Sequence, residues 1–400
     1  MSNLLEGRET GAVLGGAVLY CAGALIFSVM PAYLGNIDRL LHVSPAALGD
    51  LSAAELWSIA IASLTGPAWI KRFKWRMLAR IGAVTALVGQ LTSLWVTHFD
   101  VLLIVRVVTG IFGEGLLMAL SYSLLAQTRN VERSFGLAYA ASTVVGTVCL
   151  YSSPQLDRAL GGISVLAVLA VLAVVALCIS GVVPDNSGGA AAAESRSPSS
   201  RGETGWRSRG ALALIGQAIW YAGAGGFWSF TEQLGADNAL SVGQIARAMG
   251  IGTAAALLGT LLAAGMSNRF GRAVPIMVST VAMGIAVFAF VSSGVFGAVA
   301  AELALFNIFW ACGTIYVTAT ACSLDRSGKI AVLLPAFQTL GMALGTFVLG
   351  RCIKGLGFGS TPWIVAGFLG VGLLLVLLCL LARKSDLTED AARKTLQSIQ

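Results

Sequence analysis

The sequence has little charge. Only 11% of its 400 residues are Asp, Glu, Lys or Arg, against about 25% in an average soluble protein. Long polar stretches are also rare, and 56% of the residues are hydrophobic. Apolar runs of roughly 20 residues recur along the whole length, and each is long enough to cross about 30 Å of hydrocarbon. These features exclude an ordinary soluble protein and predict a polytopic protein embedded in a lipid bilayer.

Several motifs of enzymes and pumps are missing. The only histidines are His42 and His98, both in expected loops, and no HExxH pattern occurs. No G-x-x-x-x-G-K-[ST] loop is present, so ATP is not the expected energy source. The seven cysteines form no CxxC pair, which argues against a metal site and a disulfide framework. We therefore expect no metal, no bound cofactor and no catalytic residues; the protein is not expected to be an enzyme.

The apolar runs predict an all-α membrane protein, because a barrel would need short alternating strands instead. Between the sixth and seventh runs lies a stretch rich in Gly, Ala and Ser, which predicts a flexible linker. The expected organisation is a six-helix bundle over 1–183, the linker over 184–209, a second bundle over 210–384 and a tail over 385–400. The twelve expected spans are 10–34, 46–70, 76–97, 99–127, 132–153, 159–183, 210–231, 242–266, 273–293, 296–324, 328–353 and 360–383.

Basic residues predict the orientation, because they concentrate in cytoplasmic loops. With the N-terminus in the cytoplasm, the four basic residues of the loop 71–76, the linker, the loop 267–272 and the tail all lie inside. We therefore expect both termini to be cytoplasmic. The short loops, without large extracellular insertions, indicate a bacterial host and hence its inner membrane. The net charge of +7 is then a consequence of topology, and nucleic acid is not an expected partner.

The two halves repeat at an offset of about 198 residues, as internal duplication produces in transporters. GPAWIKRFKWR (66–76) corresponds to AGMSNRFGR (264–272), and VVGTVCLY (144–151) corresponds to ALGTFVLG (343–350). Together with RVVTG (106–110), an R-x-x-x-G pattern, these segments make the chain resemble the major facilitator superfamily over essentially its full length. The resemblance implies a secondary transporter with a central cavity, lined by the first, fourth, seventh and tenth helices. It also implies a monomer.

Some family patterns are altered. The second loop copy resembles G-x-x-x-D-R-x-G-R but has Ala264 and Asn268 at the Gly and Asp positions, and the first copy has Ile70 at the acidic position. The G-x-x-x-G-P-x-x-G-G pattern that the family's drug/proton antiporters often carry is missing from the fifth helix. The residues assigned to this conformational loop motif are Gly66, Lys71, Lys74, Arg76, Asn268, Arg269, Gly271 and Arg272.

Charge at membrane depth is costly and usually functional. A rise of 1.5 Å per residue brings Glu55 and Arg106 to the same depth and Glu114 about two turns deeper. Arg106, Gly110 and Glu114 share one helix face, which must point into the bundle. We assign Glu114, Arg106 and Glu55 to proton coupling, a role that the resemblance links to the fourth-helix Arg; the alternative is a structural ion pair between Glu55 and Arg106.

In the second half, Glu302 occupies the position equivalent to Arg106, and Arg247 is an expected partner of Glu302 or Glu232. Such a pair would be an outer gate or a structural contact. Glycines at 110, 113 and 115 predict close helix packing. Aromatic and amide residues on the expected cavity helices, with Gln338 of the eleventh, predict a substrate site for a small, partly hydrophobic organic molecule. The assigned cavity residues are Tyr20, Tyr122, Gln217, Trp220, Tyr221, Trp228, Glu302, Asn307, Trp310 and Gln338.

The sequence thus predicts a secondary active transporter of a small organic molecule that works by alternating access and is driven by a proton gradient. Arg106 would add a preference for a carboxylate. Export and uptake both stay open. The alternative is a non-transporting sensor on the same scaffold, but such proteins commonly append a soluble domain, and only sixteen residues follow Lys384.

Overall fold

The computed structural model describes residues 2–70, 72–183, 204–267, 269–323 and 329–397, and within this part of the chain it is helical without strands. Seven α-helices and one π-helical turn build the first half, in six membrane-crossing segments. These are α1 (Ser2–Leu41), α2 (Pro45–Ile70), α3 (Trp75–Ser93), α4 (Phe99–Thr109) with η1 (Gly110–Glu114) and α5 (Gly115–Leu125), α6 (Val131–Leu160) and α7 (Ser164–Ile179).

The second half has the same number of crossing segments. They are α9 (Thr204–Ser229), α11 (Val242–Met266), α12 (Ala273–Val291), α13 (Phe296–Ser323), α14 (Lys329–Leu356) and α15 (Thr361–Gln397). The short helices α10 (Thr231–Asp237) and η2 (Phe358–Ser360) lie in the connections after α9 and before α15. In the described chain, nine helices are long and apolar enough to span a membrane, and α7 is a shorter apolar helix. With α3 and α9 they agree with the twelve segments that the sequence predicts.

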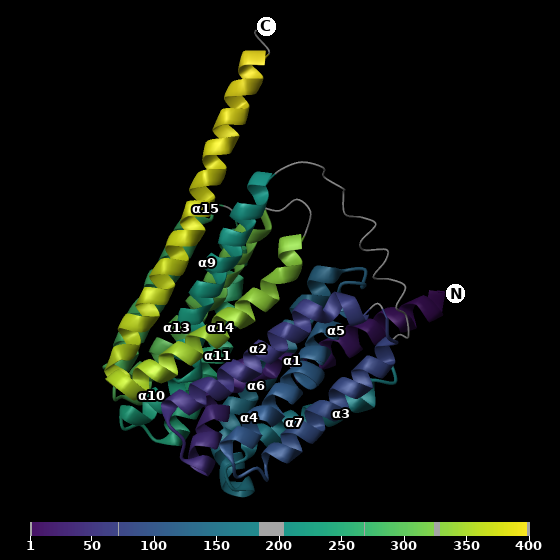
Figure 1. The fold of residues 1–400 in the computed structure, drawn as a ribbon, viewed down its shortest axis with the longest axis vertical. Helices are drawn as coiled ribbons and strands as arrows, with labels where there is room; N and C mark the ends of the chain where they lie inside the picture. Colours follow the sequence, from purple (N-terminus) through teal and green to yellow (C-terminus); the bar gives the residue numbers. More distant parts are fainter. Residues whose placement is uncertain (1, 71, 184–203, 268, 324–328, 398–400) are drawn as a thin grey trace.

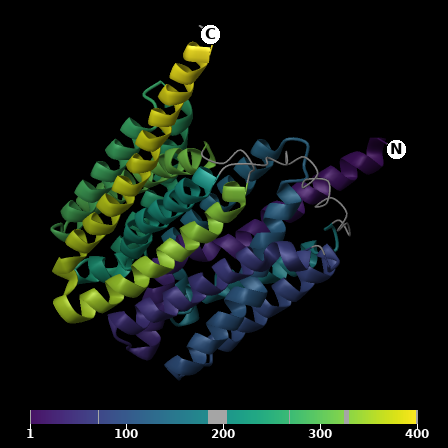
Figure 2. The same ribbon diagram turned by 45° about the horizontal axis from the view of Figure 1, so that its top comes forward.

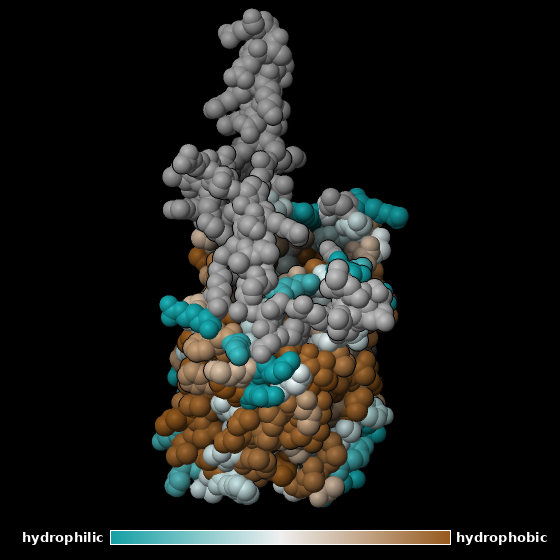
Figure 3. Space-filling model, turned by 90° about the vertical axis from the view of Figure 1, so that its right-hand side faces the viewer, coloured by the Kyte–Doolittle hydropathy of each residue, from teal (hydrophilic) through white to brown (hydrophobic). Residues whose placement is uncertain are grey.

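The segments form two bundles that lie side by side, the first half in purple to blue and the second in teal to yellow (Figures 1 and 2). Successive segments run in opposite directions, so the start of α1 and the end of α15 lie at one end of the molecule. We call this end the termini side and the other end the far side. The halves meet where α2 packs on α14 and α6 packs on α11. A broad band of apolar side chains covers the face shown in Figure 3, as lipid contact requires.

Several boundaries differ from those expected. The fifth segment runs on to Leu160 and the sixth begins only at Ser164, because Gly161 and Gly162 both have positive φ, at 72° and 87°, and end α6. Helix α9 starts at Thr204, inside the predicted linker, whose residues 184–203 are outside the described chain. Helix α15 continues through most of the predicted tail.

Candidate functional site

A cavity of about 510 Å³ lies between the two halves. Its wall includes Phe135 near the start of α6, Thr260 near the end of α11 and Pro335 near the start of α14. These three helix ends belong to the termini side, so the cavity reaches towards that side. Such a volume falls in the range of small-molecule sites, about 300–1,000 Å³.

Aromatic rings from both halves line the cavity. In the first half, the ring centroids of Tyr20 and Tyr122 lie 5.9 Å apart. In the second half, the Trp310 ring lies 6.2 Å from that of Tyr221 and 6.3 Å from that of Trp228. These spacings are typical of tilted and edge-on aromatic pairs. The cavity therefore has an aromatic cluster on each side.

Seven of the ten residues that the sequence assigns to the cavity line it. They are Tyr20, Tyr122, Tyr221, Trp228, Asn307, Trp310 and Gln338. The other three lie elsewhere. Trp220 is buried and its Nε1 donates to Thr280 Oγ1 at 3.0 Å, Gln217 is fully buried, and Glu302 lies on α13 outside the cavity wall. Adjacent positions on α9 thus face different surroundings, because one helix turn spreads its side chains around the axis.

Five residues of α6 that are not among the predicted cavity residues also line the cavity. They are the aromatic residues Phe135 and Tyr139, the hydroxyl residues Ser142 and Thr143, and Gly136. Their spacing of three or four along the fifth segment is the signal that would have found them, because such positions share one helix face.

The buried charges form a second cluster, inside the first half. Arg106 Nη2 donates to Glu55, and at 3.1 Å to Glu114 Oε1. Gln90 joins them: its Oε1 accepts from Arg106 Nη1 at 2.9 Å and its Nε2 donates to Glu114 Oε1 at 2.8 Å. The guanidinium also lies 5.2 Å from the centre of the Tyr33 ring. Four helical segments, from the first to the fourth, thus contribute to one polar cluster, which we call the charge cluster.

The charge cluster is fully enclosed. Glu55, Arg106 and Glu114 are each at most 1% exposed, and none of the three lines the cavity. Within the described chain, Glu55 Oε2 and Glu114 Oε2 are buried without a hydrogen-bond partner. Gln90 is not among the site residues predicted from the sequence, although a lone amide in the apolar run 76–97 is the signal for it.

The π-helical turn at Gly110–Glu114 lies between Arg106 and Glu114. Such turns are rare and occur frequently at functional sites. Its glycines permit close packing: a Cβ on Gly113 would lie 2.9 Å from the backbone nitrogen of Ala86, and one on Gly110 would lie 2.7 Å from Ser58 Cβ. The glycines therefore bring the fourth segment against α2 and α3, which carry the acidic and amide partners of the arginine.

On the far side, Trp228 connects the halves. Pro31 lies inside α1, and because proline has no N–H, the carbonyl of Phe27, four residues earlier, loses its helical donor. The Trp228 indole Nε1 donates to this carbonyl at 3.1 Å and to that of Ser28 at 3.2 Å. A side chain of the second half thus satisfies a carbonyl freed by proline in the first half, at the edge of the cavity.

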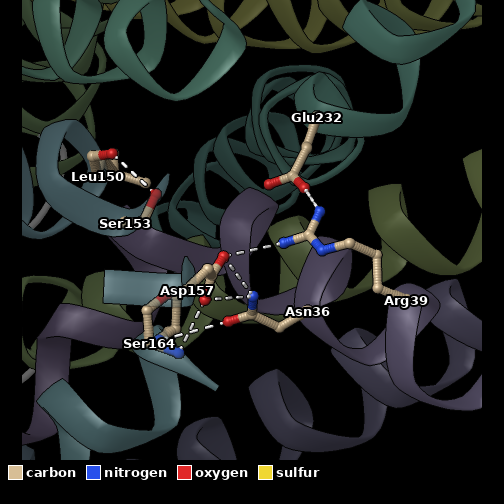
Figure 4. A network of polar contacts seen from close by, with 8 residues as sticks. Asn36, Arg39, Leu150, Ser153, Asp157, Ser164 and Glu232 are labelled. Carbon is tan, nitrogen blue, oxygen red and sulfur yellow. Dashed lines mark hydrogen bonds and ion pairs between the residues drawn. The ribbon is translucent and has the colours of Figure 1, made fainter. Parts of the chain in front are cut away.

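A polar network lies on the far side, farther from the cavity than Trp228, at the ends of α1 and α6 and on α10 (Figure 4). Arg39 forms ion pairs with Glu232 and, at 3.3 Å, with Asp157. Asn36 Nδ2 donates to both carboxylate oxygens of Asp157, at 3.2 and 3.1 Å, and Asp157 accepts from the Ser164 backbone N–H at 3.0 Å. Burial raises the pKa of Glu232 to about 7, although Arg39 acts to lower it.

The expected pairing of Arg247 with Glu232 or Glu302 is wrong. Arg39 is the partner of Glu232, while Arg247 donates from Nε to the Gly243 carbonyl and lies over the Phe296 ring. Within the described residues, no ion pair joins Arg247 to an acid. The reason is geometric, because α1 packs against α10 and brings its own last turn to Glu232.

A second ion pair joins the halves on the far side. Arg351 of α14 pairs with Asp50 of α2, with Nη1 and Oδ1 at 2.5 Å. Close backbone contact accompanies it, since a Cβ on Gly350 would lie 2.5 Å from the Pro45 carbonyl oxygen. The far side is therefore held by three sets of contacts, made by the Trp228 indole, the polar network around Arg39 and this ion pair.

The first copy of the loop motif lies on the termini side, between α2 and α3. Arg76 donates from Nη2 to the Val183 carbonyl at 3.3 Å. Gly66 lies near the end of α2, and Lys74 stands at the N-cap of α3. Lys71 lies outside the described residues.

The second copy of the loop motif lies on the same side, between α11 and α12. Gly271 has a φ of 66°, which favours glycine. Arg272 stands at the N-cap of α12, and the Arg269 backbone N–H donates to the Met266 carbonyl. Asn268 lies outside the described residues.

Comparisons with known proteins agree with this architecture. The family described as Major Facilitator Superfamily matches residues 12–230. A mutant form of the nucleoside transporter NupG superposes with a TM-score of 0.73 at 14% identity, covering 93% of this chain and 99% of that one. A D-xylose-proton symporter gives 0.70 at 16% identity, with 94% and 97% covered. The xylose transporter XylE from E. coli, in a partially occluded inward open conformation, gives 0.67 at 16%, with 93% and 96% covered. No curated protein sequence matches the chain significantly.

Proposed function

Because the chain belongs to the Major Facilitator Superfamily, we propose that it is a proton-coupled secondary transporter of a small organic solute. The solute binds in the cavity between the halves, and the halves rock about it so that the cavity opens to one side at a time. In the conformation described, the cavity reaches towards the termini side and the halves are held together on the far side. We further propose that the termini side is cytoplasmic and that the protein resides in a bacterial inner membrane.

The charge cluster is the observation that supports proton coupling. It holds two carboxyl groups and one guanidinium, so it carries a net negative charge if both acids are ionised. An uncompensated buried charge costs several kcal/mol, and one proton on Glu55 or Glu114 removes it. The partnerless Oε2 atoms are the places for this proton. One of the structural neighbours is itself named as a proton symporter.

Glu114 is the better site for the transported proton. It ends the π-helical turn, and its backbone carbonyl lies against Gly23 of α1, where a Cβ would be only 2.6 Å away. Four residues later, Met118 lines the cavity. A movement of the fourth segment on solute binding would therefore reach Glu114 directly.

The test is solute-driven proton movement in sealed proteoliposomes loaded with a pH-sensitive dye. Solutes from a panel of sugars, nucleosides, aromatic alcohols, organic acids and amphiphilic cations are added one at a time, and the solute that enters is quantified by mass spectrometry. We expect at least one solute to move protons with the wild type and to enter without proton movement in Glu114→Gln. Solute entry without proton movement in the wild type would refute the coupling, and no entry of any solute would refute the transport function.

A further inference from the structure

The wall of the cavity is uncharged. Among the described residues that line it there is no Asp, Glu, Lys, Arg or His; its polar groups are hydroxyls, the Trp228 and Trp310 indoles and the amides of Asn307 and Gln338. A charged solute would leave water without gaining an opposite charge, at an effective cost of several kcal/mol. The wall therefore discriminates against ions of either sign.

Arg106 does not supply the missing charge. It is fully buried, and its Nη atoms donate to Gln90, Glu55 and Glu114 within the charge cluster. It also lies outside the cavity wall. The position of this residue therefore gives no support to the carboxylate preference that the sequence suggests.

The hydrogen-bonding capacity of the wall indicates which groups the solute carries. The Asn307 amide donates to the Leu303 carbonyl at 2.9 Å, and the Gln338 amide donates to Thr318 Oγ1 at 3.3 Å. In both side chains the amide nitrogen therefore already donates a hydrogen bond within the protein. The amide oxygen accepts no hydrogen bond from the described residues. These two oxygens match hydroxyl or N–H donors on a solute.

From these features we propose that the transported solute is an uncharged aromatic or heteroaromatic molecule with hydroxyl or N–H donors. Its ring lies between the Tyr20–Tyr122 cluster and the Tyr221–Trp310 cluster, and its donors bind the amides of α13 and α14. This inference rests on the proposed function, because it takes the cavity as the transport site.

The test measures binding to the purified full chain in detergent, so it does not depend on transport. Two series of probes are used, and the members of each series differ mainly in charge. The first series is tryptophol, indole-3-acetate and tryptamine. The second is adenosine, adenosine 5′-monophosphate and 5′-amino-5′-deoxyadenosine. Dissociation constants are obtained from the rise in melting temperature with ligand concentration. We expect the uncharged member of at least one series to bind at least tenfold more tightly than both charged members.

Variants locate the binding. Trp310→Ala and Asn307→Leu are expected to weaken binding of the uncharged probe at least tenfold, while Trp95→Ala, at an exposed position outside the cavity, leaves it unchanged. Asn307→Asp is expected to move the preference towards the amine of the same series, because it adds the charge that the wall lacks.

A charged member that binds as tightly as its uncharged counterpart overturns the proposal, and so does the absence of binding by both uncharged probes. Binding without entry into proteoliposomes leaves the solute class standing and refutes the transport function instead. Entry of charged solutes alone overturns the solute class and leaves the transport function standing.

Discussion

The charge cluster makes a quantitative prediction about Glu114→Gln. If the folded protein holds one proton on the cluster that the unfolded chain releases, the free energy of unfolding falls by about 1.4 kcal/mol for each unit of rising pH. The sign follows because the folded state binds more protons, so acid stabilises it. Glu114→Gln leaves one carboxyl group with one guanidinium, and the neutral pair needs no proton. This contribution to the pH dependence is then lost.

Between pH 5.5 and 7.5 the contribution amounts to about 2.7 kcal/mol, or roughly 5–10 °C in melting temperature for a bundle of the size of one half. Melting is followed with a thiol-reactive fluorogenic dye, because Cys21, Cys149, Cys312 and Cys379 are buried and react only on unfolding. At each pH, the melting temperature of the variant is subtracted from that of the wild type, because the other titrating groups contribute equally to both.

Asp100→Asn is the matched control, because it also turns a carboxyl group into an amide on α4, at an exposed position outside the charge cluster. Its pH profile is expected to run parallel to that of the wild type. Arg106→Gln, which leaves two carboxyl groups without their cation, is expected to cost about 3–5 kcal/mol. Parallel profiles for the wild type and Glu114→Gln would show that the charge cluster holds no such proton.

Three other predictions concern the contacts between helices. Trp228→Phe removes the indole donor to α1 and should increase far-side opening, measured as a longer distance between spin labels on the two halves; an unchanged distance would count against this role. Gly345→Ala places a methyl group against the Ala222 carbonyl and should destabilise by about 1–3 kcal/mol, whereas Gly367→Ala meets nothing within 4 Å and should not; equal melting temperatures would contradict this. Burial raises the pKa of Glu232 to about 7, so the free energy of unfolding of the wild type should fall as the pH rises from about 4.5 to 7. Glu232→Gln should make this fall smaller. A melting temperature that depends on pH as in the wild type would contradict it.

The sequence predicts much of the fold because apolar runs report the membrane directly. The depth of each residue along its helix also predicts that Glu55 lies beside Arg106, and in the structure the two form an ion pair. Rotation about a helix axis is harder to predict, because a helix that is apolar on all sides does not show which face points inward. This is why the sequence assigns both Trp220 and Tyr221 to one cavity although only Tyr221 lines it.

Contacts between the halves could not be predicted from the sequence, for another reason. Arg39 and Glu232 are separated by 193 residues, and each stands near a helix end, where a solvated charge is the ordinary expectation. Their pairing depends on how one bundle sits against the other, which no local pattern encodes. The same holds for Trp228, whose partner is a carbonyl that Pro31 frees on the opposite half.

A chain that moves a solute across a membrane by alternating access exchanges that solute between the two sides, and counterflow measures this exchange. Sealed proteoliposomes are loaded with a high concentration of the tightest-binding membrane-impermeant probe, and entry of a labelled trace of the same probe is followed without any pH gradient. We expect label to accumulate transiently above the outside concentration, in the wild type and in Glu114→Gln alike. Label entry no faster than into protein-free liposomes would contradict it.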